Sequence, residues 1–210
     1  AHRLLGSAYI RLGSYKEAEA HLRQAIDLHK QLGNRVGLAH AHYDLASVFG
    51  RQRRNDKALD QVQQALDLYQ AVDHQVGQAR TLNAIGWYHA LLGNHYEGLA
   101  FCQRALTLCR ELGDRLCEGG TLDSIGYVHQ YLGHHPEALA CYQKAIGVWQ
   151  ELGNYYYQAT TLTHLGETHQ AAGDREAAWD IWQQAFAILD GLHHPDASQV
   201  RAKLDHLGTA

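Results

Sequence analysis

Three consecutive segments of the sequence align without a gap at a spacing of forty residues: 76–115, 116–155 and 156–195. Segment 36–75 follows the same pattern with more divergence, and residues 1–35 fit as a unit that lacks its first five positions. A period of this length indicates that one structural unit recurs and that neighbouring units bury a shared core. Matching columns hold Leu5, Leu45, Ile85, Ile125 and Leu165, then Gly6, Ala46, Gly86, Gly126 and Gly166, then Ala25, Ala65, Ala105, Ala145 and Ala185.

Each unit is predicted to form two helices, because apolar residues recur three and four positions apart in two separate segments. In the third unit these residues are Leu82, Ile85, His89 and Leu92, followed by Leu99, Cys102, Ala105, Leu106 and Leu112.

The 20 glycines, set against only 2 prolines, fall into two groups under this pattern. One group is predicted to end helices in the left-handed conformation, where glycine costs little: Gly13, Gly33, Gly93, Gly113, Gly133, Gly153 and Gly173. The other group lies inside the first helix of each unit, where a missing side chain lets the second helix approach closely: Gly86, Gly126 and Gly166.

The repeat resembles the tetratricopeptide repeat over essentially the whole chain. The fourth unit carries the family pattern as Leu122, Ile125-Gly126, His129, Ala138, Tyr142 and Ala145. Two features depart from the family: His89, His129 and His169 replace the aromatic residue of the first helix, and the unit has forty residues instead of about thirty-four. The resemblance implies an all-α fold, a right-handed α-solenoid of tandem helical hairpins whose concave face is lined by the first helices.

We therefore expect about eleven helices in one continuous domain. The predicted units are a truncated first repeat at 1–35, four further repeats at 36–75, 76–115, 116–155 and 156–195, and a capping helix at 196–210. Arg201, Lys203 and Asp205 suit the polar outer face that a terminal cap needs. The first unit begins inside a repeat, so we expect the chain to be part of a longer protein.

Composition excludes several classes of protein. The formal net charge of −4, with a basic run no longer than Arg51, Arg53 and Arg54, argues against direct binding of nucleic acid. The sequence contains no apolar stretch long enough for a membrane span and no signal peptide. Its four cysteines lack the spacing of a disulfide framework, which favours a cytoplasmic protein.

We expect neither an enzyme nor a cofactor or metal site. The 16 histidines are spread through the repeat, and His89, His129 and His169 each fill a packing position one repeat apart. His134-His135 and His193-His194 fall in predicted turns, and Cys102 and Cys109 fall in core columns. The sequence holds no phosphate-binding loop, nucleophile elbow or zinc-protease motif.

The remaining candidate for function is the groove lined by first-helix residues that turn away from the core columns. It is predicted to be basic and polar at the amino end, aromatic in the middle and acidic beyond, which suits an extended peptide or a partner helix. Packing of Trp87 and Tyr127 against the next repeat is the alternative. The candidate binding residues are Arg11, Tyr43, Arg51, Arg80, Asn83, Trp87, Asp123, Tyr127, Tyr131 and Glu167.

The family's best-known peptide binders clamp a terminal carboxylate with Lys and Asn from neighbouring first helices. Here Arg80 and Asn83 are present, but Tyr43 and Ser47 stand in the preceding repeat, so that clamp is incomplete.

Three sequence segments are similar to the C-terminal repeats of actinobacterial antibiotic-biosynthesis regulators, of the Streptomyces antibiotic regulatory protein and NB-ARC types. These segments are Leu112 to Arg115, Gly120 to Gly126 and Glu137 to Ile146. This resemblance implies a sensor domain of a larger transcriptional regulator that binds a protein, a peptide or other domains of its own parent chain. There are three alternatives: a receptor for a small molecule or short signalling peptide, a free-standing adaptor, and a domain that self-associates through its repeat ends.

Overall fold

The computed structural model describes residues 1–208, and within them every element is a helix. Most helices are 17 residues long and alternate with short turns, which confirms the predicted all-α fold of consecutive helical hairpins. The division into repeats at the predicted boundaries stays a prediction. The helices are α1 (His2–Arg11), α2 (Tyr15–Gln31), α3 (Arg35–Arg51), α4 (Asn55–Gln70), α5 (Gln75–Leu91), α6 (His95–Glu111), α7 (Arg115–Tyr131), α8 (His135–Glu151), α9 (Tyr155–Ala171), α10 (Arg175–Gly191) and α11 (Ala197–Gly208).

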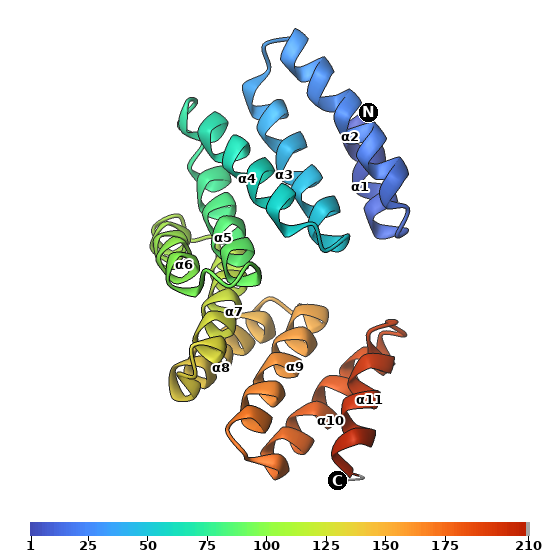
Figure 1. Cartoon of the computed structure of the whole chain (residues 1–210), viewed down its shortest axis with the longest axis vertical. Coiled ribbons are helices and arrows are strands. Elements are labelled where there is room, and N and C mark those ends of the chain that lie inside the picture. The colour runs from blue at the N-terminus through green and yellow to red at the C-terminus, as the bar shows by residue number, and fades with distance from the viewer. Residues whose placement is uncertain (209–210) are drawn as a thin grey trace. The chain divides into compact units, whose positions relative to one another are not determined.

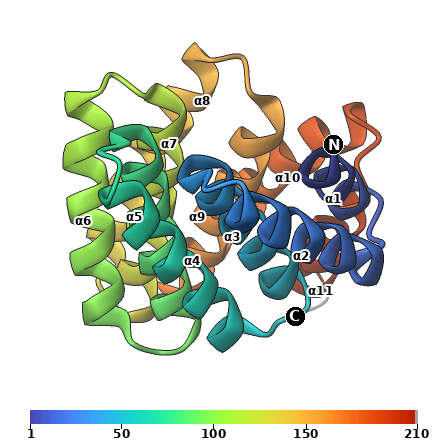
Figure 2. The same cartoon turned by 90° about the horizontal axis from the view of Figure 1, so that it is seen from above.

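The helices form two compact units, the first of which is Ala1–Leu112. Within it α1 packs on α2, α3 on α4 and α5 on α6, while α2 and α4 also contact the helix that follows each of them (Figures 1 and 2). The core of this unit comes from one face of every helix and contains Leu22, Leu45, Phe49, Val62 and Ile85. Most residues of the periodic apolar columns therefore lie inside, as helical periodicity requires, whereas Leu5 of α1 is 44% exposed.

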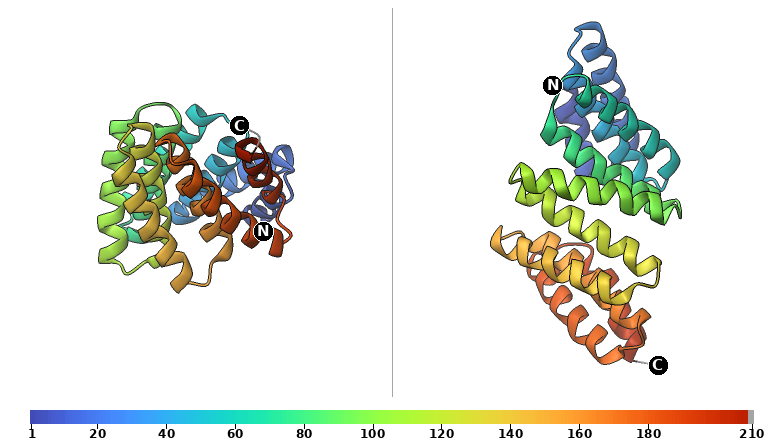
Figure 3. Two further views of the ribbon diagram at one scale, coloured as in Figure 1. Left: turned by 90° about the horizontal axis from the view of Figure 1, so that it is seen from below. Right: turned by 90° about the vertical axis from the view of Figure 1, so that its left-hand side faces the viewer.

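The second unit begins at Gly113. Here α7 packs on α8, α9 on α10, and α11 on α10 (Figures 1 and 3). Its core includes Tyr142, Leu165, Trp182 and Leu189, to which α11 contributes Val200 and Leu204. The last helix thus covers apolar surface of α10, and its role as a cap stays a prediction.

Seven of the turns between helices contain a glycine with positive φ: Gly13, Gly33, Gly93, Gly113, Gly133, Gly153 and Gly173. This confirms the glycines that the sequence predicts at helix ends. Arg53, Asp73 and His193 occupy the equivalent place in the remaining turns, with φ of 58°, 51° and 51°. A side chain in this conformation costs about 1–2 kcal/mol, so three turns of the chain are strained.

Replacing the three strained residues with glycine is expected to stabilise the protein. Each of Arg53→Gly, Asp73→Gly and His193→Gly should raise the free energy of unfolding by about 0.5–1 kcal/mol, since relief of strain exceeds the entropy that glycine adds to the unfolded chain. Thermal unfolding measures the change. Gly133→Ala is the matched control: its added Cβ would meet no atom within 4 Å, so at φ +74° only the strain remains and stability should fall. A triple variant that melts with the wild type would contradict the assignment.

Two glycines inside first helices face large side chains of the second helices, whereas Gly86 faces the smaller Cys102. A Cβ at Gly126 would lie 2.7 Å from the Tyr142 ring, and one at Gly166 would lie 2.5 Å from Trp182 Cδ1. Both distances are far below van der Waals contact, which confirms that these glycines permit the close approach. The second repeat carries Ala46 at this position, and there the facing residue is the smaller Val62.

Gly166→Ala is expected to destabilise the second unit by about 1–3 kcal/mol, because the added methyl group overpacks the contact with Trp182. Combining it with Trp182→Val reproduces the natural Ala46 and Val62 combination. The double variant should therefore lose less stability than the two single changes added together, and denaturant unfolding of all four proteins measures this coupling. If the losses of unfolding free energy are strictly additive, the residues at positions 166 and 182 are not coupled.

Candidate binding sites

Four of the predicted binding residues come together in the second unit. Asp123, Tyr127 and Tyr131 follow one face of α7, and the rings of the two tyrosines lie 4.6 Å apart. Glu167 on α9 acts electrostatically on Tyr127, and His164 on the same helix binds Asp123. The side chain of Tyr131 is 58% exposed. We call these five residues the acidic aromatic cluster: Asp123, Tyr127, Tyr131, His164 and Glu167.

The electrostatics of the cluster are dominated by its carboxylates. Burial alone would lower the pKa of the His164 imidazole, but the Asp123 carboxylate, whose Oδ1 lies 3.1 Å from Nδ1, and then Glu167 raise it above its usual value. Burial, Tyr131 and Glu167 together raise the pKa of the Tyr127 phenol. The cluster therefore combines negative charge with aromatic rings, and the Tyr127 phenol stays protonated.

The last helix contributes a cation to this region. Lys203 of α11 places its Nζ 2.7 Å from Glu167 Oε1 and 5.7 Å from the centre of the Trp182 ring. The sequence pattern predicts Lys203 on the polar outer face of the cap, whereas in the structure its side chain pairs with Glu167 of α9. The ammonium group of Lys203 thus already forms an ion pair at the acidic aromatic cluster.

The pair of Asp123 and His164 predicts a pH-dependent stability. Because the folded-state pKa of His164 is raised, the pair stabilises fully below about pH 6.5 and its contribution disappears as pH rises through the raised pKa. Asp123→Asn should therefore cost about 1.5–3 kcal/mol near pH 6 and clearly less near pH 8.5. Thermal unfolding at both pH values tests this, with the exposed Asp60→Asn as control. An equal loss at both pH values would contradict a charged pair.

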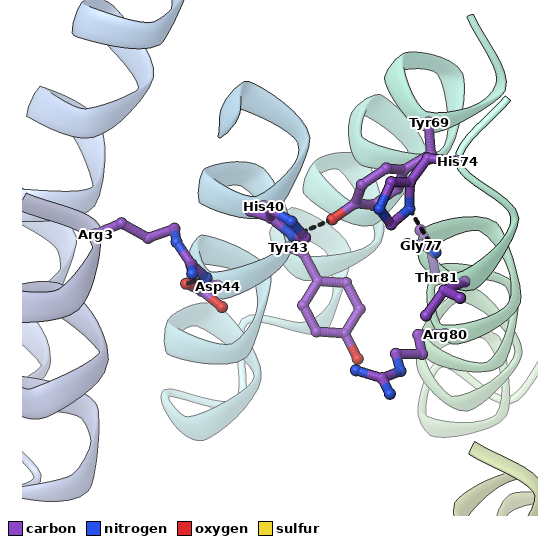
Figure 4. Close-up of a pocket in the computed structure, with 10 residues that line it drawn as sticks. Arg3, His40, Tyr43, Asp44, Tyr69, His74, Gly77, Arg80 and Thr81 are labelled. Atoms are coloured by element: carbon purple, nitrogen blue, oxygen red, sulfur yellow. Dashed lines mark hydrogen bonds and ion pairs between the residues drawn. The ribbon is translucent and has the colours of Figure 1, made fainter. Parts of the chain in front are cut away.

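A cavity of about 290 Å³ lies in the first unit, between α3, α4 and α5, with Arg3 of α1 at its edge (Figure 4). Two predicted binding residues, Tyr43 and Arg80, line it and point toward one another. The Asp44 carboxylate accepts hydrogen bonds from Arg3 Nη1 at 3.1 Å and from Ser7 Oγ at 3.2 Å. The full lining is Arg3, His40, Tyr43, Asp44, Tyr69, His74, Val76, Gly77, Arg80 and Thr81.

Tyr69 and two histidines form the inner wall of this cavity. The Tyr69 hydroxyl hydrogen-bonds to His40 Nδ1, and the Gly77 N–H donates to His74 Nδ1 at 2.9 Å (Figure 4). The His74 ring lies 5.1 Å from the Tyr69 ring. Burial, followed by the positive charges of Arg3, His74, Arg80 and His29, lowers the pKa of His40. The cations around His40 give the cavity a positive potential.

The other predicted residues lie outside these two sites. Arg11 and Arg51 are exposed near the ends of α1 and α3. Asn83 turns toward α6, where its Oδ1 lies 3.7 Å from Cys102 Sγ. Trp87 is half-buried and packs against the core of the first unit.

Sequence reasoning missed Asp44, Tyr69, His74 and His164. Asp44 and His164 occupy the same column of the repeat, and the bonds Arg3–Asp44 and Asp123–His164 both join residues 41 positions apart. A search for opposite charges or hydrogen-bonding partners separated by 41 residues, one more than the repeat length, would have found both pairs.

The structure offers no evidence of a metal or catalytic centre among residues 1–208. No group of three or more His, Cys, Asp or Glu side chains in this range is arranged to hold a metal ion. His89 instead stacks on Phe101, with ring centres 5.5 Å apart. Cys102 is a fully buried free thiol whose pKa burial raises to about 12, which suppresses its reactivity. No helix in the described part of the chain is long and apolar enough to cross a membrane.

Family comparison agrees with the architecture. A tetratricopeptide repeat model matches residues 1–71, 77–146 and 118–191. The chain therefore belongs to the tetratricopeptide repeat family. No curated protein sequence matches it.

Solved structures share this fold at low sequence identity. BtubC from P. vanneervenii has a TM-score of 0.76 and 17% identity, covering 92% of this chain and 82% of BtubC. The Rap conjugation gene regulator of plasmid pLS20, in complex with the Phr* peptide, gives 0.82 and 18%, covering 97% of this chain and 56% of Rap. A signal transduction ATPase with a tetratricopeptide repeat sensor, from Pyrococcus horikoshii, gives 0.70 and 14%, covering 97% of this chain and 35% of the ATPase.

Proposed function

We propose that this chain is a protein- or peptide-binding sensor domain of a larger bacterial transcriptional regulator. The acidic aromatic cluster is the observation that carries the proposal, because it presents an exposed tyrosine beside two carboxylates on adjacent first helices. Aromatic anchors of this kind supply much of the binding energy at interfaces. The family assignment, and fold neighbours that include a peptide-bound Rap regulator and an ATPase with a repeat sensor, support a binding role.

The chemistry of the cluster favours a basic segment of the partner. A lysine or arginine side chain can pair with Glu167 and Asp123 while resting on the faces of Tyr127 and Tyr131. The ion pair that Lys203 makes with Glu167 at 2.7 Å supports this chemistry, and a basic side chain of the partner would take the place of Lys203 there. The role is non-catalytic and needs no cofactor.

The regulatory part of the proposal rests on the resemblance of Leu112–Arg115 and Gly120–Gly126 to actinobacterial regulators. It places the protein in the cytoplasm, where groove occupancy would control DNA-binding and ATPase modules of the same parent chain. The coding sequence upstream of Ala1 tests it: a winged-helix or ATPase module there supports the regulator, and a complete short gene contradicts it in favour of a free-standing adaptor. A role in antibiotic biosynthesis belongs to the same proposal.

Loss of the exposed tyrosine is expected to weaken partner binding without affecting the fold. Peptides selected from a random library on the wild-type chain should bind Tyr131→Ala about tenfold more weakly, as expected for an interface anchor. Selected peptides should also be enriched in lysine and arginine. Fluorescence anisotropy measures the affinity, and circular dichroism confirms unchanged helicity.

The matched control is Tyr155→Ala, because Tyr155 is 60% exposed but lies at the start of α9, outside the cluster. Its affinity for the same peptides should equal that of the wild type. If both variants lose affinity equally, or neither does, the acidic aromatic cluster is not the binding surface.

A further inference from the structure

One buried hydroxyl group in the wall of the first-unit cavity has no partner. Thr81 on α5 is fully buried and lines the cavity, and its Oγ1 makes no hydrogen bond to any described residue. The threonine at the equivalent position of α9, Thr161, accepts a hydrogen bond of 3.1 Å from Trp149 Nε1. An unsatisfied buried hydroxyl costs free energy, so Thr81 is suited to a group that enters from the cavity.

The reason that Thr81 lacks a partner lies in two substitutions between the repeats. At the positions where the second unit has Trp149 and Tyr157, the first unit has Tyr69 and Gly77. The rings of Trp149 and Tyr157 stack with centres 5.0 Å apart. Tyr69 has no indole N–H, its hydroxyl binds His40, and Gly77 contributes no side chain. The Tyr69 ring itself lies against Gly77, where an added Cβ would come within 2.5 Å of it, so the first unit lacks the second of the two stacked rings.

The charges around the opening are mainly positive. Arg3 and Arg80 line it against one carboxylate, Asp44, which Arg3 and Ser7 already hold. His40 and His74 add imidazoles from α3 and from the start of α5, and His29 of α2 also acts on His40. The flat rings of Tyr43, Tyr69 and the two histidines form the walls. A volume of about 290 Å³ suits one small molecule or one side chain.

We propose that this cavity binds a small, flat organic anion whose carboxylate is attracted by Arg80 and Arg3 and whose hydroxyl group hydrogen-bonds to Thr81. The site uses other residues than the acidic aromatic cluster, so it goes beyond the proposed function and can hold or fail independently of it.

Calorimetric titration of the whole chain with three related probes tests the proposal. 4-Hydroxybenzoate carries both groups, benzoate lacks the hydroxyl, and phenol lacks the carboxylate. 4-Hydroxybenzoate should bind about fivefold more tightly than either, since each probe loses one net hydrogen bond or charge contact. In Thr81→Val the advantage of 4-hydroxybenzoate over benzoate should vanish, while benzoate binds as before. Removing the unpartnered hydroxyl should not lower the unfolding temperature.

Thr161→Val is the control, because it changes the same column of the repeat in the second unit and should leave all three affinities unchanged. Arg80→Gln, a change at an exposed side chain, should weaken binding of both carboxylates and leave binding of phenol unaffected. Binding of the carboxylates should also tighten as pH falls through the lowered pKa of His40, because its proton adds a positive charge to those of Arg3 and Arg80, with Asp44, His74 and the nearby His29 as the other titratable groups around it.

The anion can be a free metabolite or the end of a peptide. N-Acetyltyrosine carries the same phenol and carboxylate on a peptide-like body, so tighter binding by it than by 4-hydroxybenzoate identifies a peptide terminus, and weaker binding identifies a free small molecule. Absence of saturable binding by all of these probes, or binding that Thr81→Val and Arg80→Gln leave unchanged, would overturn the proposal.

Discussion

The close contact between a small residue of the first helix, glycine or alanine, and the facing side chain of the second determines how each hairpin packs. Where the pair is Gly166 with Trp182 or Gly126 with Tyr142, the ring lies against bare backbone. Burying such rings stabilises far more than the roughly 1 kcal/mol that an internal glycine costs in helix propensity. This contact sets which first-helix residues face away from the second helix. Both candidate sites lie among those residues or beside them.

Much of the fold follows from the sequence because the signals are local. The forty-residue spacing, the glycines at positive φ and the apolar columns predict the hairpins and their turns. The interpretation of Trp87 was harder: its column predicts exposure, but whether a large ring stays in solvent depends on the neighbouring helix, and here it packs on the core. Arg3 with Asp44, and Asp123 with His164, were not foreseen because the offset between adjacent first helices sets which residues meet.

The two units use equivalent positions for opposite chemistry. In the first unit, arginines and histidines surround an open cavity with one carboxylate. In the second, carboxylates and tyrosines surround a histidine, and stacked rings replace the opening. Repeat proteins can diverge in this way because each repeat must keep only the columns that contact its neighbours. The side chains between those columns are free to specialise, which explains why composition and net charge averaged over the chain conceal both sites.

The strained turns at Arg53 and Asp73 lie at the two ends of one helix, α4, which also supplies Tyr69 to the cavity wall. Strain stored at both ends lowers the free energy needed to open that helix locally, compared with helices whose turns carry glycine. Amide hydrogens of α4 should therefore exchange with solvent before those of α6 or α8. The wall that Tyr69 supplies is therefore the part of the cavity expected to loosen first, while the helices bounded by glycine turns keep their packing.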